Sequence, residues 1–189
     1  MSPKAVFAYA AAALAALLAL FATSASGAAF VLGGGMADGC SRAAIAGRDD
    51  RPSLDLCSMA LETQPLLKRD RAGTYVNRGV IHLRRKAFAE ARRDFDAALR
   101  LEPALGEAFV NRGAAFIAQR RYREGVNEID RGLALGPDEP EKAYFNRALA
   151  HEGLDDMKAA WLDYQKALEL RPDWEAPRRE LTRFQVSRP

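Results

Sequence analysis

The sequence has few residues of the kinds that build metal centres, disulfide frameworks and catalytic sites. Its 189 residues include only two cysteines and two histidines, too few for a metal cluster or a dense set of disulfides. The formal net charge of +3 is too small to require a polyanionic partner, so no nucleic acid is expected as a ligand. It also lacks a glycine-rich phosphate loop. These absences predict a non-catalytic protein with no cofactor and no metal.

The first thirty residues differ in composition from the rest of the chain. An uncharged run extends from Ala5 to Phe21, and the small-residue stretch ATSASGA follows it. This pattern predicts a signal peptide over residues 1–28, with cleavage near Ala25 or Ala28, and export to a periplasm. The alternative is a retained inner-membrane anchor, because apolar character resumes in AAFVLGGGMA and about 20 apolar residues span a bilayer.

A short string recurs through the remainder of the chain. YVNRG at 75–79 is followed by FVNRG at 109–113 and YFNRA at 144–148. Their small residues are 34 and 35 positions apart, and a period of about 34 predicts a unit of two helices. Counted from positions 72, 106 and 141, small residues recur at unit positions 8, 20 and 27, and proline at position 32. These residues are Gly79, Gly113 and Ala148; Ala91, Gly125 and Ala160; Ala98, Gly132 and Ala167; and Pro103, Pro137 and Pro172.

This pattern has a packing explanation. Small residues let two antiparallel helices approach closely, and the aromatic residues at positions 4 and 24 fill the space beside them. Each proline follows an apolar helical run and ends it, since it has no N–H to donate and clashes with the preceding turn.

In these features the chain resembles the tetratricopeptide repeat family across 72–172. The resemblance implies an all-α protein, a right-handed α-solenoid of helix hairpins. Three full repeats are expected at 72–105, 106–140 and 141–172. A degenerate hairpin is expected before them at 38–71, joined to the signal by a linker at 29–37, and a capping helix and tail are expected at 173–189.

Both cysteines fall in the degenerate unit. CSMALETQP at 57–65 aligns with FDAALRLEP at 95–103, which places Cys40 and Cys57 at neighbouring positions on the two helices. In an exported protein this pair is predicted to form a disulfide that stabilises the short unit by about 3 kcal/mol. The alternatives are two free buried thiols, or a thiol–disulfide sensor or redox helper that uses the same pair.

An arginine and an acidic residue also recur sixteen positions apart in each full repeat. Their spacing predicts salt bridges between the two helices of one unit or between adjoining units. The pairs are Arg78 with Asp94, Arg112 with Glu128, and Arg147 with Asp163. Clusters of basic residues at Arg84 to Lys86 and Arg120 to Arg123 are predicted to lie in solvated turns, with weak contact to an anionic membrane surface as a further hypothesis.

The resemblance also implies a function. In this family the first helices line a concave groove, which here would be apolar with a row of asparagines. Such a groove suits an extended or helical segment of a partner protein, and the predicted function is an adaptor or scaffold in the cell envelope. A homodimer through the same face is the competing arrangement. The predicted groove residues are Val76, Asn77, Val80, Leu83, Val110, Asn111, Ala114, Ile117, Phe145, Asn146 and Leu149.

Overall fold

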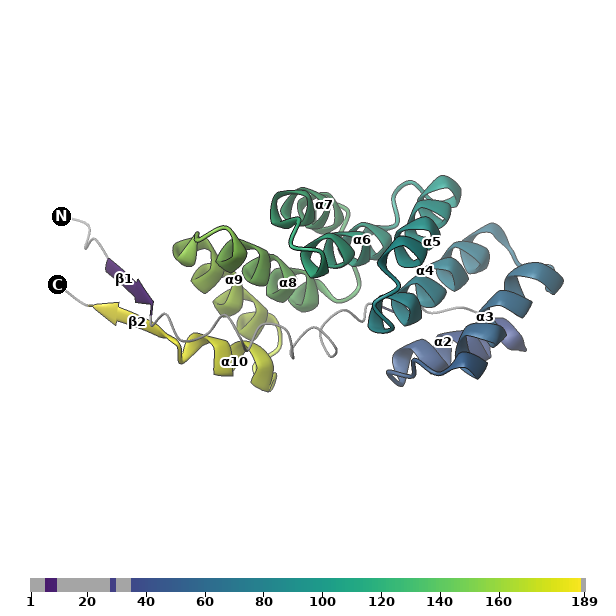
Figure 1. Ribbon diagram of the computed structural model, residues 1–189, viewed down its shortest axis with the longest axis horizontal. Coiled ribbons are helices and arrows are strands. Elements are labelled where there is room, and N and C mark those ends of the chain that lie inside the picture. The colour runs from purple at the N-terminus through teal and green to yellow at the C-terminus, as the bar shows by residue number, and fades with distance from the viewer. Residues whose placement is uncertain (1–5, 10–27, 30–34, 188–189) are drawn as a thin grey trace.

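The structure, a computed structural model, describes residues 6–9, 28–29 and 35–187. Its helices stack as antiparallel hairpins into an elongated solenoid (Figure 1). The predicted all-α solenoid is therefore confirmed. The helices are α2 (Met36–Ile45), α3 (Arg51–Thr63), α4 (Lys68–Arg84), α5 (Phe88–Leu101), α6 (Gly106–Ala118), α7 (Tyr122–Ala134), α8 (Pro140–Gly153), α9 (Met157–Leu170) and α10 (Glu175–Leu181).

The three central hairpins, α4–α5, α6–α7 and α8–α9, are held together by close helix crossings. A methyl group added at Gly113 would lie 2.7 Å from Ile129 and 2.9 Å from the carbonyl oxygen of Gly125. One added at Gly79 would lie 2.5 Å from the ring of Phe95. The small residues at the crossings are thus required by the distance between the helices.

The turn inside each of these hairpins uses a residue in the left-handed region. Lys86, Arg120 and Asp155 all have φ of 60°, and they occupy the same position of successive units. The turns between hairpins instead contain the recurring prolines. Pro103, for example, lies two residues after the last residue of α5.

The first hairpin, α2–α3, is shorter than the others. Asp50 caps α3, accepting a hydrogen bond from the backbone N–H of Ser53 at 2.9 Å. The hydrogen bonds that Asp50 accepts from Arg48 and from Ser53 lower its pKa to about 2. Helix α2 begins at Met36, two residues before the predicted start of this hairpin at residue 38 and inside the segment predicted to be a linker at 29–37. The sequence gives little indication that α2 begins at Met36, because Gly35, which precedes the helix, has a positive φ and provides no side-chain cap.

The two cysteines of this hairpin face each other. The sulfur atoms of Cys40 in α2 and Cys57 in α3 lie 2.10 Å apart, at bonding distance. Both residues are fully buried and pack with Ala43, Leu54 and Ile81. The link therefore joins α2 to α3 and lies against α4.

The opposite end of the solenoid is covered by α10, and a two-stranded ribbon extends beyond it (Figure 1). Trp174 and Phe184 pack against a cluster that contains Phe145 and Tyr164, so aromatic side chains cover the last hairpin. Strand β1 (Val6–Tyr9) pairs antiparallel with β2 (Phe184–Ser187), with Tyr9 opposite Phe184. This pairing was not predicted, because the sequence pattern of 1–28 indicated a signal peptide.

Most of the predicted signal peptide lies outside the described residues, which include only 6–9 and 28 of that segment. In the part of the chain that the structure describes, no helix has the length and apolar character needed to cross a membrane.

Candidate functional site

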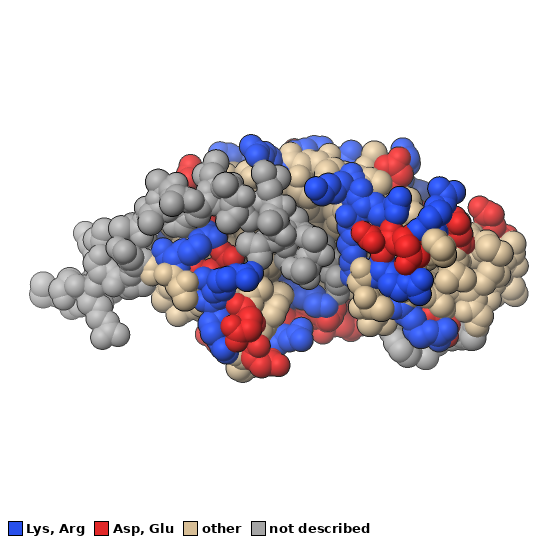
Figure 2. Space-filling model, turned by 60° about the horizontal axis from the view of Figure 1, so that its bottom comes forward, with Lys and Arg blue, Asp and Glu red and all other residues tan. Residues whose placement is uncertain are grey.

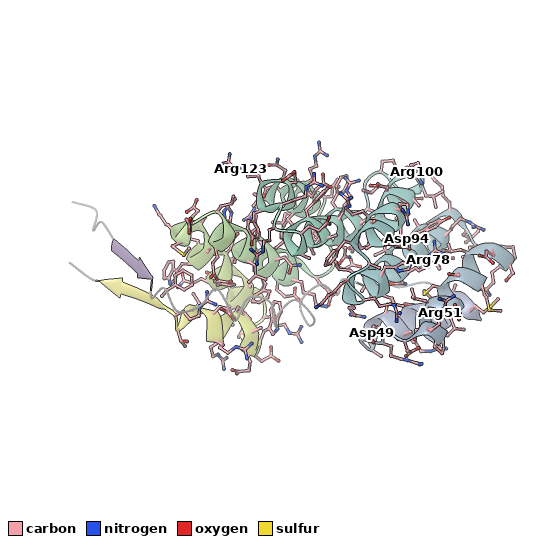
Figure 3. All side chains as sticks on the ribbon, viewed as in Figure 1. Asp49, Arg51, Arg78, Asp94, Arg100 and Arg123 are labelled. Atoms are coloured by element: carbon pink, nitrogen blue, oxygen red, sulfur yellow. A yellow bond between two sulfur atoms is a disulfide. The ribbon has the colours of Figure 1, made fainter. Side chains whose placement is uncertain are left out.

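The recurring arginine of each unit binds the acid sixteen residues later. Arg78 of α4 donates from Nε and Nη2 to the two carboxylate oxygens of Asp94 in α5, at 2.9 and 2.7 Å, and both side chains lie at the crossing of these helices (Figure 3). The hydrogen bond to Asp94 raises the pKa of Arg78, although burial opposes the shift. Such bidentate contacts fix orientation as well as charge.

Each arginine also reaches the second helix of the preceding unit. Nη1 of Arg112 donates to Asp96 at 2.6 Å, and Nη1 of Arg147 donates to Asp130 at 2.6 Å. The corresponding partner of Arg78 is the hydroxyl of Ser58, at 3.2 Å. The sequence predicted salt bridges either within a unit or between adjoining units. The structure shows that the same arginine makes both.

The aromatic residue three positions earlier lies under the same arginine. The guanidinium carbons of Arg78, Arg112 and Arg147 lie 5.6, 5.2 and 5.2 Å from the ring centroids of Tyr75, Phe109 and Tyr144. These are cation–π contacts. The aromatic residue and the arginine of the recurring string therefore act together to hold neighbouring hairpins in place.

A histidine adjoins this network in the first repeat. Nε2 of His82 lies 3.9 Å from the carboxylate of Asp94, and burial lowers the pKa of His82 below its ordinary value. The matching position of the middle repeat is Phe116, whose ring centroid lies 5.2 Å from the guanidinium carbon of Arg92 and 4.5 Å from that of Arg121. The position thus serves packing. In the described residues, no group of three or more His, Cys, Asp or Glu side chains could hold a metal ion.

All eleven predicted groove residues lie on the first helices α4, α6 and α8, as the repeat frame requires, and all are buried. Val76 and Phe145 have no exposed surface. They are core residues, which sequence reasoning could not separate from groove residues because both fall on apolar positions of one helix. The three asparagines of the set are equally buried, at 0%, 1% and 4% exposure, and they are its only members with side-chain hydrogen-bonding groups.

Asn77 holds a main-chain group from outside the repeats. Its Nδ2 donates to the carbonyl oxygen of Ala29 at 2.9 Å, and the hydroxyl of Ser41 donates to the same oxygen at 3.1 Å. Asn77 has no exposed surface, and its Oδ1 has no hydrogen-bond partner among the described residues. An asparagine at this position thus binds the backbone of a passing chain.

The other two asparagines of the row differ from Asn77. Nδ2 of Asn111 donates to the carbonyl oxygen of Glu107 at 2.9 Å, one turn earlier in the same helix. Asn111 and Asn146 both line a small pocket between α6 and α8. The other residues that line this pocket are Glu107, Val110, Pro137, Glu139 and Lys142.

A buried polar cluster that the sequence did not indicate joins the last repeat to the cap. The hydroxyl of Tyr164 donates to Glu152 at 2.5 Å, and Arg183 bonds both Glu152 and Glu180. Burial raises the pKa of Tyr164 and that of Glu180. Glu180 and Arg183 lie outside the repeat pattern, so no periodic signal points to them.

The basic cluster at the end of α4 was interpreted as a solvated turn, and this was wrong for Arg84, which is half-buried, whereas Arg85 and Lys86 are exposed. Nη1 of Arg84 donates to the carbonyl oxygen of Ala44 at 2.7 Å, and Nη1 of Arg85 donates to that of Asp49 at 2.5 Å. These contacts attach the α2–α3 hairpin to the first full repeat. On the face shown in Figure 2, basic and acidic side chains are interspersed among the described residues.

Known proteins support the repeat assignment directly. The family model described as "Tetratricopeptide repeat" matches residues 72–105, and a second model of the same description matches 141–173. The chain is a tetratricopeptide repeat protein. The middle hairpin, α6–α7, repeats the same crossings and the same arginine contacts between these two matches. No curated protein matches this tetratricopeptide repeat protein.

Solved structures share its fold at low sequence identity. The TPR domain of Arabidopsis OM64 superposes with a TM-score of 0.57 at 22% identity, covering 62% of this chain and 96% of that one. MamA residues 41-end from Desulfovibrio magneticus RS-1 gives 0.60 at 19%, with 78% and 82% covered. The first TPR of Spaghetti (RPAP3), solved with the HSP90 peptide SRMEEVD, gives 0.56 at 22%, with 60% and 90% covered.

Proposed function

We propose that this protein is a non-catalytic adaptor that binds an extended segment of a partner protein on the concave side of its repeats. The observation that carries the proposal is the hydrogen bond from Asn77 to the carbonyl oxygen of Ala29. It is a contact between a groove asparagine and the backbone of a residue that does not belong to the repeats. A primary amide can donate to a carbonyl and accept from an N–H, which suits it to main-chain recognition.

The small pocket between α6 and α8, with an accessible volume of about 10 Å³, has room for about one water molecule and marks a second place where the proposed groove offers polar groups. It contains two more asparagines, and Lys142, Glu107 and Glu139 give its rim charges of both signs. This mixed rim does not favour a carboxylate-terminated ligand. The Spaghetti TPR is described with the peptide SRMEEVD, which shows that the fold accommodates a peptide; the ligand proposed here is instead an uncharged extended segment.

The thiol–disulfide alternative is the weaker hypothesis. Cys40 and Cys57 have no exposed surface, and a redox-active pair must be reached by another thiol. Their burial supports a structural bridge. Such a bridge persists in an oxidising compartment, and together with the apolar run at 5–21 it supports a location in the periplasm, with inner-membrane anchoring as the alternative. Self-association through the concave face and weak contact with an anionic membrane remain predictions.

The test is a peptide selection on the full chain. Random nonapeptides displayed on phage are selected against the purified protein, and the binding of the enriched peptides is measured by calorimetry. Asn111→Leu and Asn146→Leu keep the side-chain size and remove the amide, so each is expected to weaken binding by about tenfold. Asn127→Leu, at an exposed position of α7, is the matched control. Unchanged binding to both groove variants would refute the proposal.

A further inference from the structure

Two residues from outside the repeats lie at the first-hairpin end of the groove. Ala29 is 9% exposed and packs with a cluster from α4, α5 and α6, while Ala28 packs against the cluster that contains the cysteine pair. Ala28 and Ala29 thus lie where α2 contacts α4 (Figure 1). Its position matches that of the proposed external ligand.

The polar contacts to this pair come from two different hairpins. Ser41 belongs to α2 and Asn77 to α4, and both donate to the carbonyl oxygen of Ala29. Both side chains are almost completely buried, at 3% and 0% exposure. Burying a polar side chain is unfavourable unless it is hydrogen-bonded. The hydrogen bonds to the carbonyl oxygen of Ala29 therefore offset the free-energy cost of burying these two donors.

The position of Asn77 makes a purely structural role a poor explanation. Its Oδ1 has no partner among the described residues, and a leucine there would fill the same volume without that cost. An amide is advantageous at this position if a main-chain segment binds there and presents its carbonyl, as Ala29 does. An incoming peptide would also bring N–H groups within reach of Oδ1.

We infer that Ala28 and Ala29 act as a tethered ligand, occupying the Asn77 end of the groove until an external peptide displaces them. This inference rests on the proposed function. A tethered segment competes at an effective concentration of the order of millimolar, so only a peptide that gains further contacts, such as those of the α6–α8 pocket, can replace it. The groove is thereby closed to weak, nonspecific ligands.

The same contacts define the chemistry of the displacing peptide. The Ala29 side chain lies in an apolar cluster made largely of small residues, and close-packed surroundings do not accept added volume without strain. The residue that replaces Ala29 must therefore be alanine, glycine or serine, with its carbonyl free for Asn77 and Ser41. Cleavage of the predicted signal after Ala25 would leave both residues on the chain, whereas cleavage after Ala28 would leave Ala29 as the first residue.

The experiment compares three full-length proteins: the wild type, Ala29→Asp and Ala104→Asp. Ala29→Asp places a charge in the buried cluster, whereas Ala104 lies in an exposed turn and is the matched control. Hydrogen exchange is followed in the peptide spanning residues 24–33. A synthetic labelled peptide of sequence SASGAAFVLG, which copies these residues, is then titrated against each protein.

The expected result has two parts. Residues 28 and 29 are protected in the wild type and in Ala104→Asp, and this protection is lost in Ala29→Asp. The labelled peptide then binds Ala29→Asp at least about tenfold more tightly than the other two proteins, because the competitor has been removed. Asn77→Leu in the full chain should also lose the protection of residues 28 and 29.

Three results would overturn the inference. Rapid exchange of residues 28 and 29 in the wild type means that the pair is not bound. Lost protection in Ala29→Asp without a gain in peptide binding means that Ala28 and Ala29 only stabilise the fold. Protection that disappears on dilution, together with a dimer in light scattering, means that the pair comes from a second copy. None of these affects the Asn111 and Asn146 test, so failure of the inference can be distinguished from failure of the proposed function.

Discussion

Arg147 donates to both carboxylate oxygens of Asp163, from Nε and Nη2, each at 2.8 Å. Its remaining Nη1 bonds Asp130 of the preceding hairpin, and its guanidinium lies over the ring of Tyr144. One side chain therefore contacts three helices, α7, α8 and α9. Arg112 likewise contacts Glu128 in α7, Asp96 in α5 and the ring of Phe109, although it bonds only one carboxylate oxygen of Glu128.

Replacing the half-buried Arg147 should destabilise the solenoid more than replacing an exposed arginine. Arg147→Met leaves Asp163, which is 7% exposed, without its partner, and losing one member of a buried pair costs about 3 kcal/mol. Chemical denaturation followed by circular dichroism measures the change. Arg178→Met is the control, because its exposed pair with Glu175 should contribute less than about 1 kcal/mol. Equal losses for the two variants would contradict the assigned role.

The crossing of α6 and α7 should not tolerate a single methyl group. Gly113→Ala places a Cβ 2.9 Å from the carbonyl oxygen of Gly125, and overpacking is expected to cost about 1 to 3 kcal/mol. Gly39→Ala is the matched control in α2, where the new methyl group meets Leu56 at an ordinary 3.6 Å. Because alanine favours a helix over glycine, this control should gain up to about 1 kcal/mol. Thermal melting of both variants tests the contrast.

The cysteine pair should stabilise the first hairpin. Joining residues 17 positions apart restricts the unfolded chain, which corresponds to about 3 kcal/mol. Reduction is therefore expected to lower the stability of α2 and α3, measured as faster hydrogen exchange there, while α8 and α9 are unchanged. The double variant Cys40→Ser, Cys57→Ser should show the same faster exchange without reductant and no further response to it. A reductant effect that persists in the double variant would exclude the bridge as its cause.

His82 should make the stability depend on pH in the mildly acidic range. Burial lowers its pKa from the ordinary 6.5, so the folded state disfavours the protonated ring. The stability is complete above about 6.5 and is lost as the pH falls below that value, with a slope of at most about 1.4 kcal/mol per pH unit. The nearby Asp94 opposes this shift and Arg78 reinforces it.

His82→Phe tests this dependence, because Phe116 already occupies the matching position of the next repeat. The variant should fold and should lose less stability than the wild type between pH 7 and pH 5, on a scale of about 1 kcal/mol. Urea denaturation at several pH values measures the difference. Identical pH profiles for the two proteins would show that His82 is not the responsible group.

Most of the repeat architecture could be predicted because each unit repeats the same local constraints. Small residues such as Gly79 and Gly113 mark the helix crossings, and prolines such as Pro103 and Pro137 mark the helix ends. The period of 34 can therefore be recognised from the positions of these residues alone. The start of α2 was missed because Met36 follows a run of glycines and has no capping side chain before it. The cluster of Glu152, Tyr164 and Arg183 was missed because Arg183 lies outside the period.

The groove was only partly predictable. The positions of Val76 and Phe145 could be assigned to the first helices, but a helix position does not reveal whether the side chain faces a partner hairpin or solvent. Both are core residues in the structure. Asn77 was identified as a group that could bind a peptide backbone, yet no spacing in the sequence connects it with Ala29, which lies 48 positions earlier.

The sequence by itself determined the hairpin unit, its number of copies and the charged pair within each copy, because these depend on contacts between residues a fixed distance apart along the chain. Tertiary structure decided which neighbour each arginine reaches, how the two ends are closed and what lies at the Asn77 end of the groove. These features depend on contacts between residues at irregular separations, where packing and the burial of polar groups select one partner from many.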